Sequence, residues 1–570
     1  MGKMSQKCML RLTLRQQSYK IKSATDCAIL ERKNVAEAVS RRYLKNIEKS
    51  WKKEQIYGGE CEKIFSHTEK VNIMKKQVYR KLLAACVSVS LGTVLLAGCG
   101  DSAGTTGTKT EVQENNTSED VVEPVGEVTT FTLPDGPEES DIFVQPVADI
   151  SDDFIRGMDA SAVLSVENSG AVYYGYDGKE QDVFETLAQS GVNYIRLRVW
   201  NDPYDENGNG YGGGNNDLTT AMKLGVRAAR YGMKVCIDFH YSDFWADPKR
   251  QHAPKAWEGM TVDEKSDALY DYTTESLGKL LDAGVDVGMV QIGNEINNGM
   301  SGETDVDAVM QLLNSGSKAV REVAESYGKD IKVAVHYTNI EDNDQIDTMA
   351  ANLKDAGVDY DMFGLSFYPF WDGTNENMQN AAKLIEDKYG KEVYIAETSY
   401  CYTSEDGDGF SNSLKGTDDL TDGYGATVQS QATVIRDICA AANEAGVEGV
   451  FYWEGTWIPV GSADADNSAL WEKYGSGWAS SYSAEYDPDD AGLYYGGCSW
   501  DNQAMFDFTG HPLASLNVFK YLKYGATAPL AVDYIPDVYV SCNVGEDLVL
   551  PESIDVVYND RSQNKKQSVS

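Results

Sequence analysis

The chain has 570 residues, of which 42% are hydrophobic and 10% aromatic, a composition typical of a folded protein rather than a disordered one. Its formal net charge of −39 argues against a nucleic-acid partner and suits a neutral or cationic partner, or a glycan. At this length we expect either several domains or one large α/β barrel with flanking segments.

The charge changes sign along the chain, since residues 1–98 carry a net +12 and the remaining residues a net −51. Met74-Lys75-Lys76 opens a basic stretch, an apolar run follows from Leu82 to Gly98, and Cys99 comes directly after it. This is the pattern of a secretory signal. The ending Leu-Ala-Gly-Cys resembles a bacterial lipobox, which implies cleavage before Cys99 and a diacylglycerol on its thiol. A transmembrane anchor is the alternative, with an apolar run near the lower limit for a span.

Three segments therefore precede the expected folded part: an unassigned leader at 1–73, a lipoprotein signal peptide at 74–98, and an acidic low-complexity linker at 99–150. The signal predicts an extracellular protein that is lipid-anchored to the bacterial cell membrane through Cys99. Downstream, the chain has five further cysteines. This odd number, without close metal-ligand spacing, does not indicate a disulfide framework.

Between residues 151 and 525 short apolar runs alternate with helical patterns. Strands are expected at 154–159, 194–200, 234–240, 289–295, 331–336, 362–368, 393–397 and 449–454. Helices are expected around 181–190, 218–231, 262–283, 304–327, 344–355, 377–389, 427–445 and 514–523. Eight such units predict an α/β fold, a (β/α)₈ TIM barrel. The alternative, a doubly wound open sheet, would usually carry a Gly-rich turn after its first strand, and none follows residues 154–159.

The pattern changes after residue 525. Residues 526–570 have no helical periodicity, and 545–551 and 554–558 have the character of two strand fragments. They resemble the start of a bacterial immunoglobulin-like repeat, so we expect a partial β segment. A disordered tail is the alternative.

Polar residues gather at the ends of the predicted strands, where barrels carry their chemistry. Glu295 and Glu397 each end an apolar strand, on the fourth and seventh units, so their side chains can point across the barrel mouth at one another. Two opposed carboxylates are what glycoside hydrolysis requires: one protonates the leaving oxygen and the other attacks the anomeric carbon. Two rim glutamates held in salt bridges are the alternative.

Longer motifs surround these two residues. They are Arg196-Leu-Arg-Val-Trp200-Asn-Asp-Pro-Tyr204, Gly212-Gly-Gly-Asn-Asn-Asp217, Asp238-Phe-His240-Tyr-Ser-Asp243-Phe-Trp245-Ala-Asp247-Pro248, Pro254-Lys-Ala-Trp257, Gln291-Ile-Gly-Asn294-Glu295 and Glu397-Thr-Ser-Tyr400. Over about residues 152–525 the chain resembles the arabinogalactan endo-β-1,4-galactanases, glycoside hydrolase family 53, among the retaining barrel glycosidases of clan A.

The resemblance implies roles for individual residues. Glu295 is the expected general acid/base and Glu397 the expected nucleophile. Arg196 is expected to hold Glu397 ionised, since a nearby cation lowers a carboxyl pKa. The expected substrate-binding residues are Arg196, Asp238, His240, Trp245, Asn294, His336, Tyr368 and Trp453.

A further loop after the seventh strand has oxygen-bearing side chains two or four residues apart, at Asp406, Asp408 and Asn412, with Gly407 and Gly409 among them. Such a loop can wrap calcium, which takes six to eight oxygen ligands. The resemblance implies a calcium ion here, held by Asp406, Asp408, Phe410 through its carbonyl, Asn412 and, from the loop after the eighth strand, Asp501. A solvated acidic turn is the alternative, and Phe410 and Cys498 depart from the family pattern.

The sequence thus predicts a retaining endo-hydrolase of β-1,4-galactosidic bonds in the (arabino)galactan side chains of pectin. Its expected partner is the galactan polysaccharide, with no nucleic acid, membrane contact through a lipidated Cys99, and a monomeric state. The alternatives are another clan A β-glycanase, a mannanase or cellulase, and a lipid-anchored sugar-binding protein. A binder needs aromatic platforms but not two opposed carboxylates.

Overall fold

The computed structural model describes residues 8–10, 122–538, 540–542, 551, 553–561 and 567–568. The chain separates into two compact units, Met1–Leu12 with Ser118–Ser570, and Thr13–Thr117, of which the second lies outside the described residues. The predicted signal peptide and Cys99 also lie outside them, as does most of the predicted leader. Within the described ranges, no helix combines the length and the apolar character that a membrane crossing requires.

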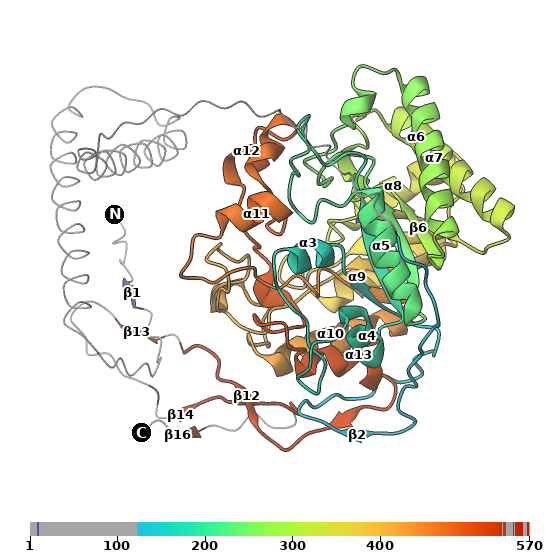
Figure 1. The fold of residues 1–570 in the computed structure, drawn as a ribbon. Helices are drawn as coiled ribbons and strands as arrows, with labels where there is room; N and C mark the ends of the chain where they lie inside the picture. The colour runs from blue at the N-terminus through green and yellow to red at the C-terminus, as the bar shows by residue number, and fades with distance from the viewer. Residues whose placement is uncertain are drawn as a thin grey trace, which may run out of the picture. The chain divides into compact units, whose positions relative to one another are not determined.

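Eight parallel strands close into a barrel, and β10 pairs with β3 to complete the ring. Figure 1 shows the barrel with the helices around it. The strands are β3 (Ile155–Asp159), β4 (Tyr194–Val199), β5 (Lys234–Phe239), β6 (Val287–Ile292), β7 (Lys332–Tyr337), β8 (Met362–Ser366), β9 (Glu392–Glu397) and β10 (Gly449–Tyr452). The predicted (β/α)₈ fold is confirmed, with strand ends within a few residues of those expected.

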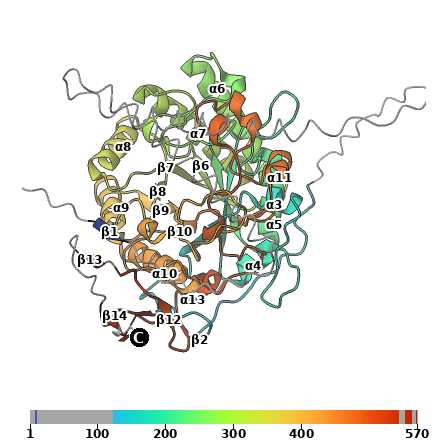
Figure 2. The ribbon, with the colours of Figure 1, turned by 90° about the vertical axis from the view of Figure 1, so that its left-hand side faces the viewer.

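Helices alternate with the strands and surround them (Figure 2). They are α4 (Val183–Gln189), α5 (Leu218–Arg230), α6 (Val262–Asp282), α7 (Val306–Tyr327), α8 (Asn343–Asp355), α9 (Asn375–Tyr389), α10 (Val428–Glu444) and α13 (Val518–Tyr521). Most begin at an N-cap whose side chain accepts a backbone N–H, such as Asp217 for α5 and Thr261 for α6. The helix predicted over 514–523 is shorter, because Ala514–Asn517 form a 3₁₀ turn before α13.

Among the described residues, three short helices lie outside this alternation. The sequence analysis did not predict α3 (Val163–Asn168), which follows β3 directly. In the long loop after β10 lie α11 (Ser468–Tyr474) and α12 (Ala491–Tyr494). This loop therefore has local structure of its own.

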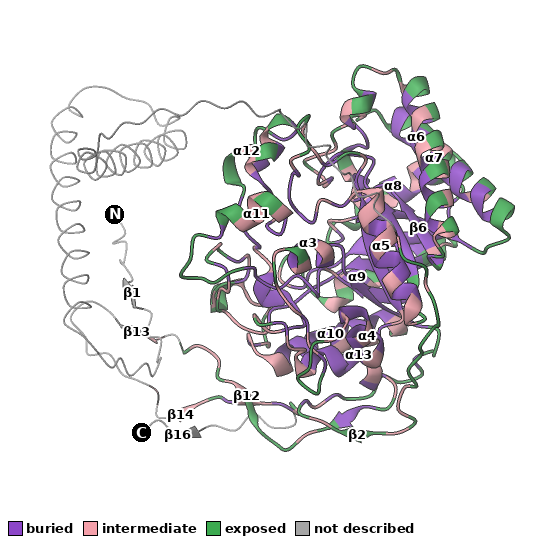
Figure 3. Cartoon of the chain, in the orientation of Figure 1, coloured by how far each residue is buried: buried purple, intermediate pink, exposed green. Residues whose placement is uncertain are grey.

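The interior of the barrel changes from apolar to polar along the strands. One layer is apolar and fully or nearly buried; it contains Tyr194, Cys236, Met289, Ala334, Met362, Tyr394, Ala396 and Phe451. A side chain on Gly157 would come within 2.2 Å of the Phe451 ring, which explains the glycine on β3. Two residues further along β4, β5, β6 and β7 come Arg196, Asp238, Gln291 and His336, which are also buried (Figure 3 shows the burial of these strands). Since side chains alternate in a strand, these four point into the same interior as the apolar layer.

The segments on either side of the barrel pack against it and against each other. In the N-terminal segment, β2 (Glu138–Glu139) pairs with β11 (Ala526–Thr527), and Ile142, Val144 and Val147 are buried. In the C-terminal segment, β12 (Val532–Tyr534) pairs with β15 (Val557–Tyr558). The remaining short strands are β1 (Cys8–Leu10), which pairs with β13 (Val540–Cys542), and β14 (Ser553–Ile554), which pairs with β16 (Gln567–Ser568).

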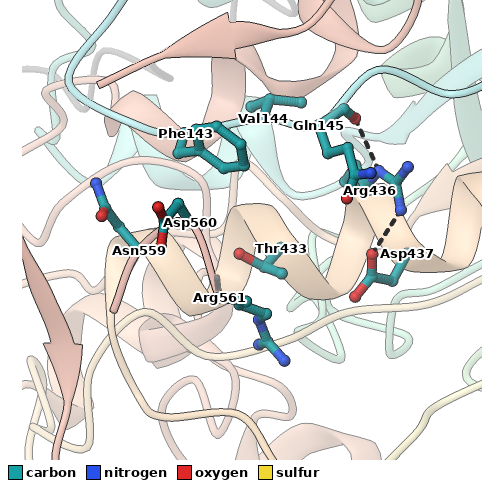
Figure 4. A pocket seen from close by; sticks show the side chains of 9 residues that line it. All are labelled: Phe143, Val144, Gln145, Thr433, Arg436, Asp437, Asn559, Asp560 and Arg561. Atoms are coloured by element: carbon teal, nitrogen blue, oxygen red, sulfur yellow. Dashed lines mark hydrogen bonds and ion pairs between the residues drawn. The ribbon is translucent and has the colours of Figure 1, made fainter. Parts of the chain in front are cut away.

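The two segments also meet at helix α10. A small pocket of about 50 Å³ is lined by residues 143–145, by Thr433, Arg436 and Asp437 of α10, and by residues 559–561 (Figure 4). Arg436 donates to the carbonyl oxygens of Gln145 and Pro146. Part of the segment expected as a linker is therefore packed on the barrel. The predicted domain boundaries and the immunoglobulin-like interpretation of 526–570 stay predictions.

Candidate active site

Arg196 lies at the centre of a buried polar cluster where the strands end. Its Nη1 is 2.9 Å from Oε1 of Glu397 and 3.2 Å from Oδ2 of Asp159, and its Nη2 is 2.8 Å from Oδ2 of Asp238. Three carboxylates on three strands thus share one guanidinium, whose side chain is 1% exposed. Because that side chain is almost completely buried, the carboxylates supply the charge partners that a buried cation requires.

Glu397, at the end of β9, receives hydrogen bonds on both oxygens. Arg196 donates to Oε1, and the Tyr368 hydroxyl donates to Oε2 at 2.9 Å. Burial raises the pKa of Glu397 above its usual range, while the Arg196 charge and the Tyr368 hydrogen bond act in the opposite direction. The expected contact with Arg196 is present, but burial outweighs the lowering of the pKa that was expected from it.

Glu295 follows β6 after a tight turn. Gly293 has a φ of +96° and Glu295 itself a φ of +44°, in the left-handed region that residues with a side chain rarely adopt. This backbone brings Oε1 of Glu295 to 2.7 Å from Oγ of Ser366 on β8. Burial and repulsion by Glu397 raise the pKa of Glu295 well above its usual range.

The two carboxyl groups therefore have unlike surroundings. Glu397 has a cation and a phenol beside it, whereas the carboxyl group of Glu295 is hydrogen-bonded to the hydroxyl of a serine. The charge of each disfavours ionisation of the other, and these surroundings favour the ionised form more at Glu397 than at Glu295. The arrangement can thus provide one acid and one ionised carboxylate at the same opening of the barrel.

The other predicted residues of this region hold the pair in place. Asp238 forms an ion pair with Arg196 and accepts from Gln291; burial raises its pKa, but the Arg196 charge and the hydrogen bond from His240 outweigh that effect and lower it. Nδ1 of His240 accepts from the Trp200 indole and from the Ala246 amide, so its Nε2 donates to Asp238. Both ring nitrogens of His240 thus bond to protein groups.

Asn294 and His336 lie deeper than a sugar-contacting role alone would require. Asn294 accepts from Arg196 and donates to the carbonyl oxygen of Ala246. His336 lies between Asn294 and Ser366, and burial and the Arg196 charge lower its pKa well below the usual range.

Indole rings extend from the acid pair across the loops. Trp245 lies 6.1 Å from Trp453 between ring centroids, and Trp453 lies 5.0 Å from Trp500. Trp371, 5.9 Å from Trp500, is 58% exposed, so its face is open to solvent. The predicted Trp245 and Trp453 thus belong to one row of rings, in which Trp500 was not predicted.

Three residues of the cluster were missing from the predicted site: Asp159, Gln291 and Ser366. Asp159 ends β3 just as Glu397 ends β9, so its position at a strand end could have identified it as a site residue. Gln291 is a polar residue in an apolar strand, which also indicates a buried partner. Ser366 had no such signal, because a serine is compatible with ordinary core packing.

The predicted metal-binding residues also lie together. One oxygen from each of Asp406, Asp408 and Asp501 can be chosen so that all lie within 4.8 Å of one another. Burial raises the pKa of Asp408 to about 6, and burial together with repulsion by Asp408 raises that of Asp501 to about 7. The amide of Asn412 donates to Asp501, while its buried Oδ1 has no hydrogen-bond partner among the described residues. Phe410 donates its backbone N–H to Asp408, and its ring packs near Trp471.

These residues fit a hard cation on chemical grounds. Three carboxylates at this spacing repel one another when ionised, and a buried amide oxygen without a donor is costly. Calcium takes oxygen ligands of both kinds. Whether the Phe410 carbonyl takes part stays a prediction.

The chain is similar to known proteins of one family. The family described as glycosyl hydrolase family 53 matches residues 155–519. An endo-beta-1,4-galactanase of Bacillus subtilis is 53% identical over 389 residues, which covers 68% of this chain and 90% of that protein. An arabinogalactan endo-beta-1,4-galactanase of Cellvibrio japonicus is 35% identical over 57% of this chain and 85% of its own. The solved Ignisphaera aggregans GH53 catalytic domain is 38% identical with a TM-score of 0.60, over 67% of this chain and 99% of that domain.

Proposed function

This chain belongs to glycosyl hydrolase family 53, and from that premise we propose that it hydrolyses internal β-1,4-galactosidic bonds of pectic galactan with retention of anomeric configuration. The observation that carries the proposal is the unequal pair of carboxyl groups. Arg196 and Tyr368 both donate to Glu397, while burial and the Glu397 charge keep a proton on Glu295. Retaining glycosidases use a nucleophile and an acid in this way.

The reaction proceeds in two steps. Glu397 attacks the anomeric carbon and forms a glycosyl ester, while Glu295 gives its proton to the leaving oxygen as the glycosidic bond breaks. Esterification removes the Glu397 charge, so the repulsion that raised the pKa of Glu295 disappears and Glu295 can act as a base. A water then gives a proton to Glu295, attacks the same carbon and releases Glu397.

Product analysis on galactan, mannan and cellulose side by side tests the substrate. We expect oligosaccharides of mixed length from galactan at early times, as internal cleavage requires, and no products from the other two. Glu397→Ala should abolish turnover and keep galactan binding. Turnover of mannan or cellulose in place of galactan would contradict the proposal, and retained turnover in Glu397→Ala would remove Glu397 from the chemistry.

A calcium ion at Asp406, Asp408, Asn412 and Asp501 is part of the proposal. The spacing of the carboxylates and the unpaired Oδ1 of Asn412 support it. The cluster joins the loop after β9 to the loop after β10, which also contains Trp500. When bound, the ion would neutralise these carboxylates and tie the two loops together; the catalytic pair carries out the chemistry.

We also propose that the mature protein is extracellular and attached to the bacterial membrane through a lipidated Cys99. The basic stretch, the apolar run and the lipobox-like ending support this. A diacylated cysteine provides two chains, which anchor stably. Cys99→Ala should leave the membrane fraction, whereas Cys86→Ala, inside the apolar run, should stay there. If Cys99→Ala also stays, the apolar run is itself the anchor.

A further inference from the structure

The hydrogen-bond network around Ser366 determines where the proton of the acid lies. The amide of Asn294 has a fixed orientation, because its Oδ1 is 2.9 Å from Nη2 of Arg196, which can only donate. Its Nδ2 is 2.8 Å from the carbonyl oxygen of Ala246, which can only accept. Oδ1 is therefore the atom that faces Nδ1 of His336, at 2.9 Å. Since Oδ1 only accepts, Nδ1 of His336 carries a proton.

Gln291 does not change this assignment. Its Nε2 is 3.2 Å from Nδ1 of His336, but it is closer to Oδ1 of Asp238, at 2.6 Å, and to the carbonyl oxygen of Gly293, at 3.1 Å. These two acceptors use both protons of the amide nitrogen. Gln291 therefore does not need His336 as an acceptor.

The proton on Nδ1 determines what Ser366 does. His336 is buried beside Arg196, so the ring is neutral and its Nε2 has a free lone pair. Nε2 lies 2.9 Å from Oγ of Ser366. The single hydroxyl proton of Ser366 has two acceptors within reach, this lone pair and Oε1 of Glu295, and both contacts become hydrogen bonds only if it points to His336 while Glu295 brings a proton of its own.

The same Oγ is 2.7 Å from Oε1 of Glu295; with its proton directed to His336 it accepts at this contact, and with its proton directed to Glu295 it donates there. We infer that Oε1 of Glu295 holds the acid proton in the free enzyme and donates it to Ser366, and that the Ser366 hydroxyl turns to donate to Glu295 when the acid is ionised. Ser366 is thus a positioning residue, which gives each protonation state of Glu295 a hydrogen bond of the correct direction.

The inference rests on the proposed function, and it adds a rotation of the Ser366 hydroxyl to each of the two reaction steps. As Glu295 gives its proton to the leaving oxygen, the Ser366 hydroxyl turns from Nε2 of His336 to Oε1 of the new carboxylate. When water returns a proton to Glu295, the hydroxyl turns back to His336. Ser366 and His336 keep their own protons throughout. Stabilising both states in turn suits a residue that acts first as acid and then as base.

Nitrogen NMR of histidine labelled with ¹⁵N tests the network without any substrate. The chain has five histidines, and His336→Gln assigns the signal of His336 by removing it. We expect a neutral ring with its proton on Nδ1 and a hydrogen-bonded, unprotonated Nε2. In Ser366→Ala the proton should stay on Nδ1, while the Nε2 signal moves to that of a nitrogen without a hydrogen bond. A proton on Nε2 in the unmodified protein would overturn the inference, even if Ser366→Ala did not fold.

Kinetics on galactan test the role of the hydroxyl. Ser366→Ala should lower kcat about tenfold to hundredfold with little change in KM, because a hydrogen bond to an ionised group is lost. Ser366→Thr, which keeps a hydroxyl, should recover part of that loss. The matched control is Ser399→Ala, which removes a buried serine hydroxyl that donates to Gln503. An unchanged kcat in Ser366→Ala would refute the role of Ser366, whereas absence of galactan turnover in the unmodified chain would refute the proposed function instead.

Discussion

The hydroxyl of Tyr368 donates to Oε2 of Glu397, on the oxygen that Arg196 does not contact. The carboxylate is thus held by a cation on one side and by a phenol on the other. Both stabilise the ionised form and fix the direction of the group. Tyr368 comes from the loop after β8 and Glu397 from β9, which are neighbouring strands.

Removal of this hydroxyl should impair catalysis more than it impairs the fold. We expect Tyr368→Phe to lower kcat/KM on galactan about tenfold to hundredfold, because a hydrogen bond to a charged group contributes about 1.5–3 kcal/mol. Tyr241→Phe is the control, since it removes a buried hydroxyl bonded to Thr273. Equal kinetic losses in both variants would show that Tyr368 acts through packing alone.

The pH dependence of kcat/KM should be bell-shaped. The active form has Glu295 protonated and Glu397 ionised, so activity is lost below the pKa of Glu397 and above that of Glu295. Because burial and Glu397 raise the pKa of Glu295, the alkaline limb should lie well above the ordinary carboxyl value of about 4.3. The two measured values belong to the pair rather than to single residues. An alkaline limb near 4.3 would contradict the environment that the structure gives Glu295.

The two carboxyl groups can be distinguished by chemical rescue with azide. In Glu397→Ala, azide can take the place of the missing nucleophile and should give an α-glycosyl azide from an aryl β-galactobioside. In Glu295→Ala, azide should attack the glycosyl ester of Glu397 from the opposite side and give the β-azide. NMR of the products distinguishes the two anomers. The reverse assignment of anomers would exchange the proposed roles, and an inverted product from the unmodified enzyme would exclude retention.

The sequence predicted the barrel well because its signals are local. Each strand is a short apolar run, and each helix has its own periodicity and N-cap, as at Asp217 and Thr261. The ends of the strands could also be located in the sequence, which placed Glu295, Glu397 and Arg196 at one opening of the barrel. The number of strand–helix units was then enough to predict a closed ring.

What the sequence could not show depends on contacts between strands. The role of Ser366 depends on its contacts with His336 and Glu295, which come from two other strands. The residues next to 366 in the sequence indicate neither contact. Likewise, His240 has the residue type of a sugar ligand, yet Trp200 and Ala246 occupy its Nδ1. The left-handed φ of Glu295 follows from a turn whose sequence, Gly-Asn-Glu, fits several conformations.

A second buried ion pair supports the row of tryptophans. Arg198 contacts Glu454, which directly follows Trp453, and its guanidinium carbon lies 4.2 Å from the centre of the Trp245 ring. Arg198→Met should destabilise the fold by about 3–5 kcal/mol, because Glu454 would remain buried without its cation. Denaturant unfolding measures the loss. Lys332→Met, which breaks a half-exposed pair with Glu392, should change stability by about 1 kcal/mol or less. Equal losses of stability in the two variants would contradict the role of the buried Arg198–Glu454 pair.

Calcium should stabilise the protein without taking part in the chemistry. The proposed ligands lie on the loops after β9 and β10, and a cation that binds only the folded state adds about 2.7 kcal/mol at a hundredfold excess over its dissociation constant. For a domain of this size that corresponds to a rise in Tm of about 3–5 °C. Chelation should therefore lower Tm, and calcium should restore it.

Variants of two aspartates distinguish an effect of calcium at this site from an effect of surface charge in general. Asp408→Ala should abolish the response of Tm to calcium and keep some turnover at low temperature, because the Asp408 carboxylate accepts hydrogen bonds from the backbone of Phe410 and Cys498 rather than from a group that holds the catalytic pair. Asp464→Ala, an exposed residue on the loop after β10, should keep the full response. Trp500 directly precedes Asp501, so loss of the ion should also raise KM by disturbing the row of indole rings. A Tm that is unchanged after exhaustive chelation, with no cation found in the folded protein, would make this cluster an acidic turn.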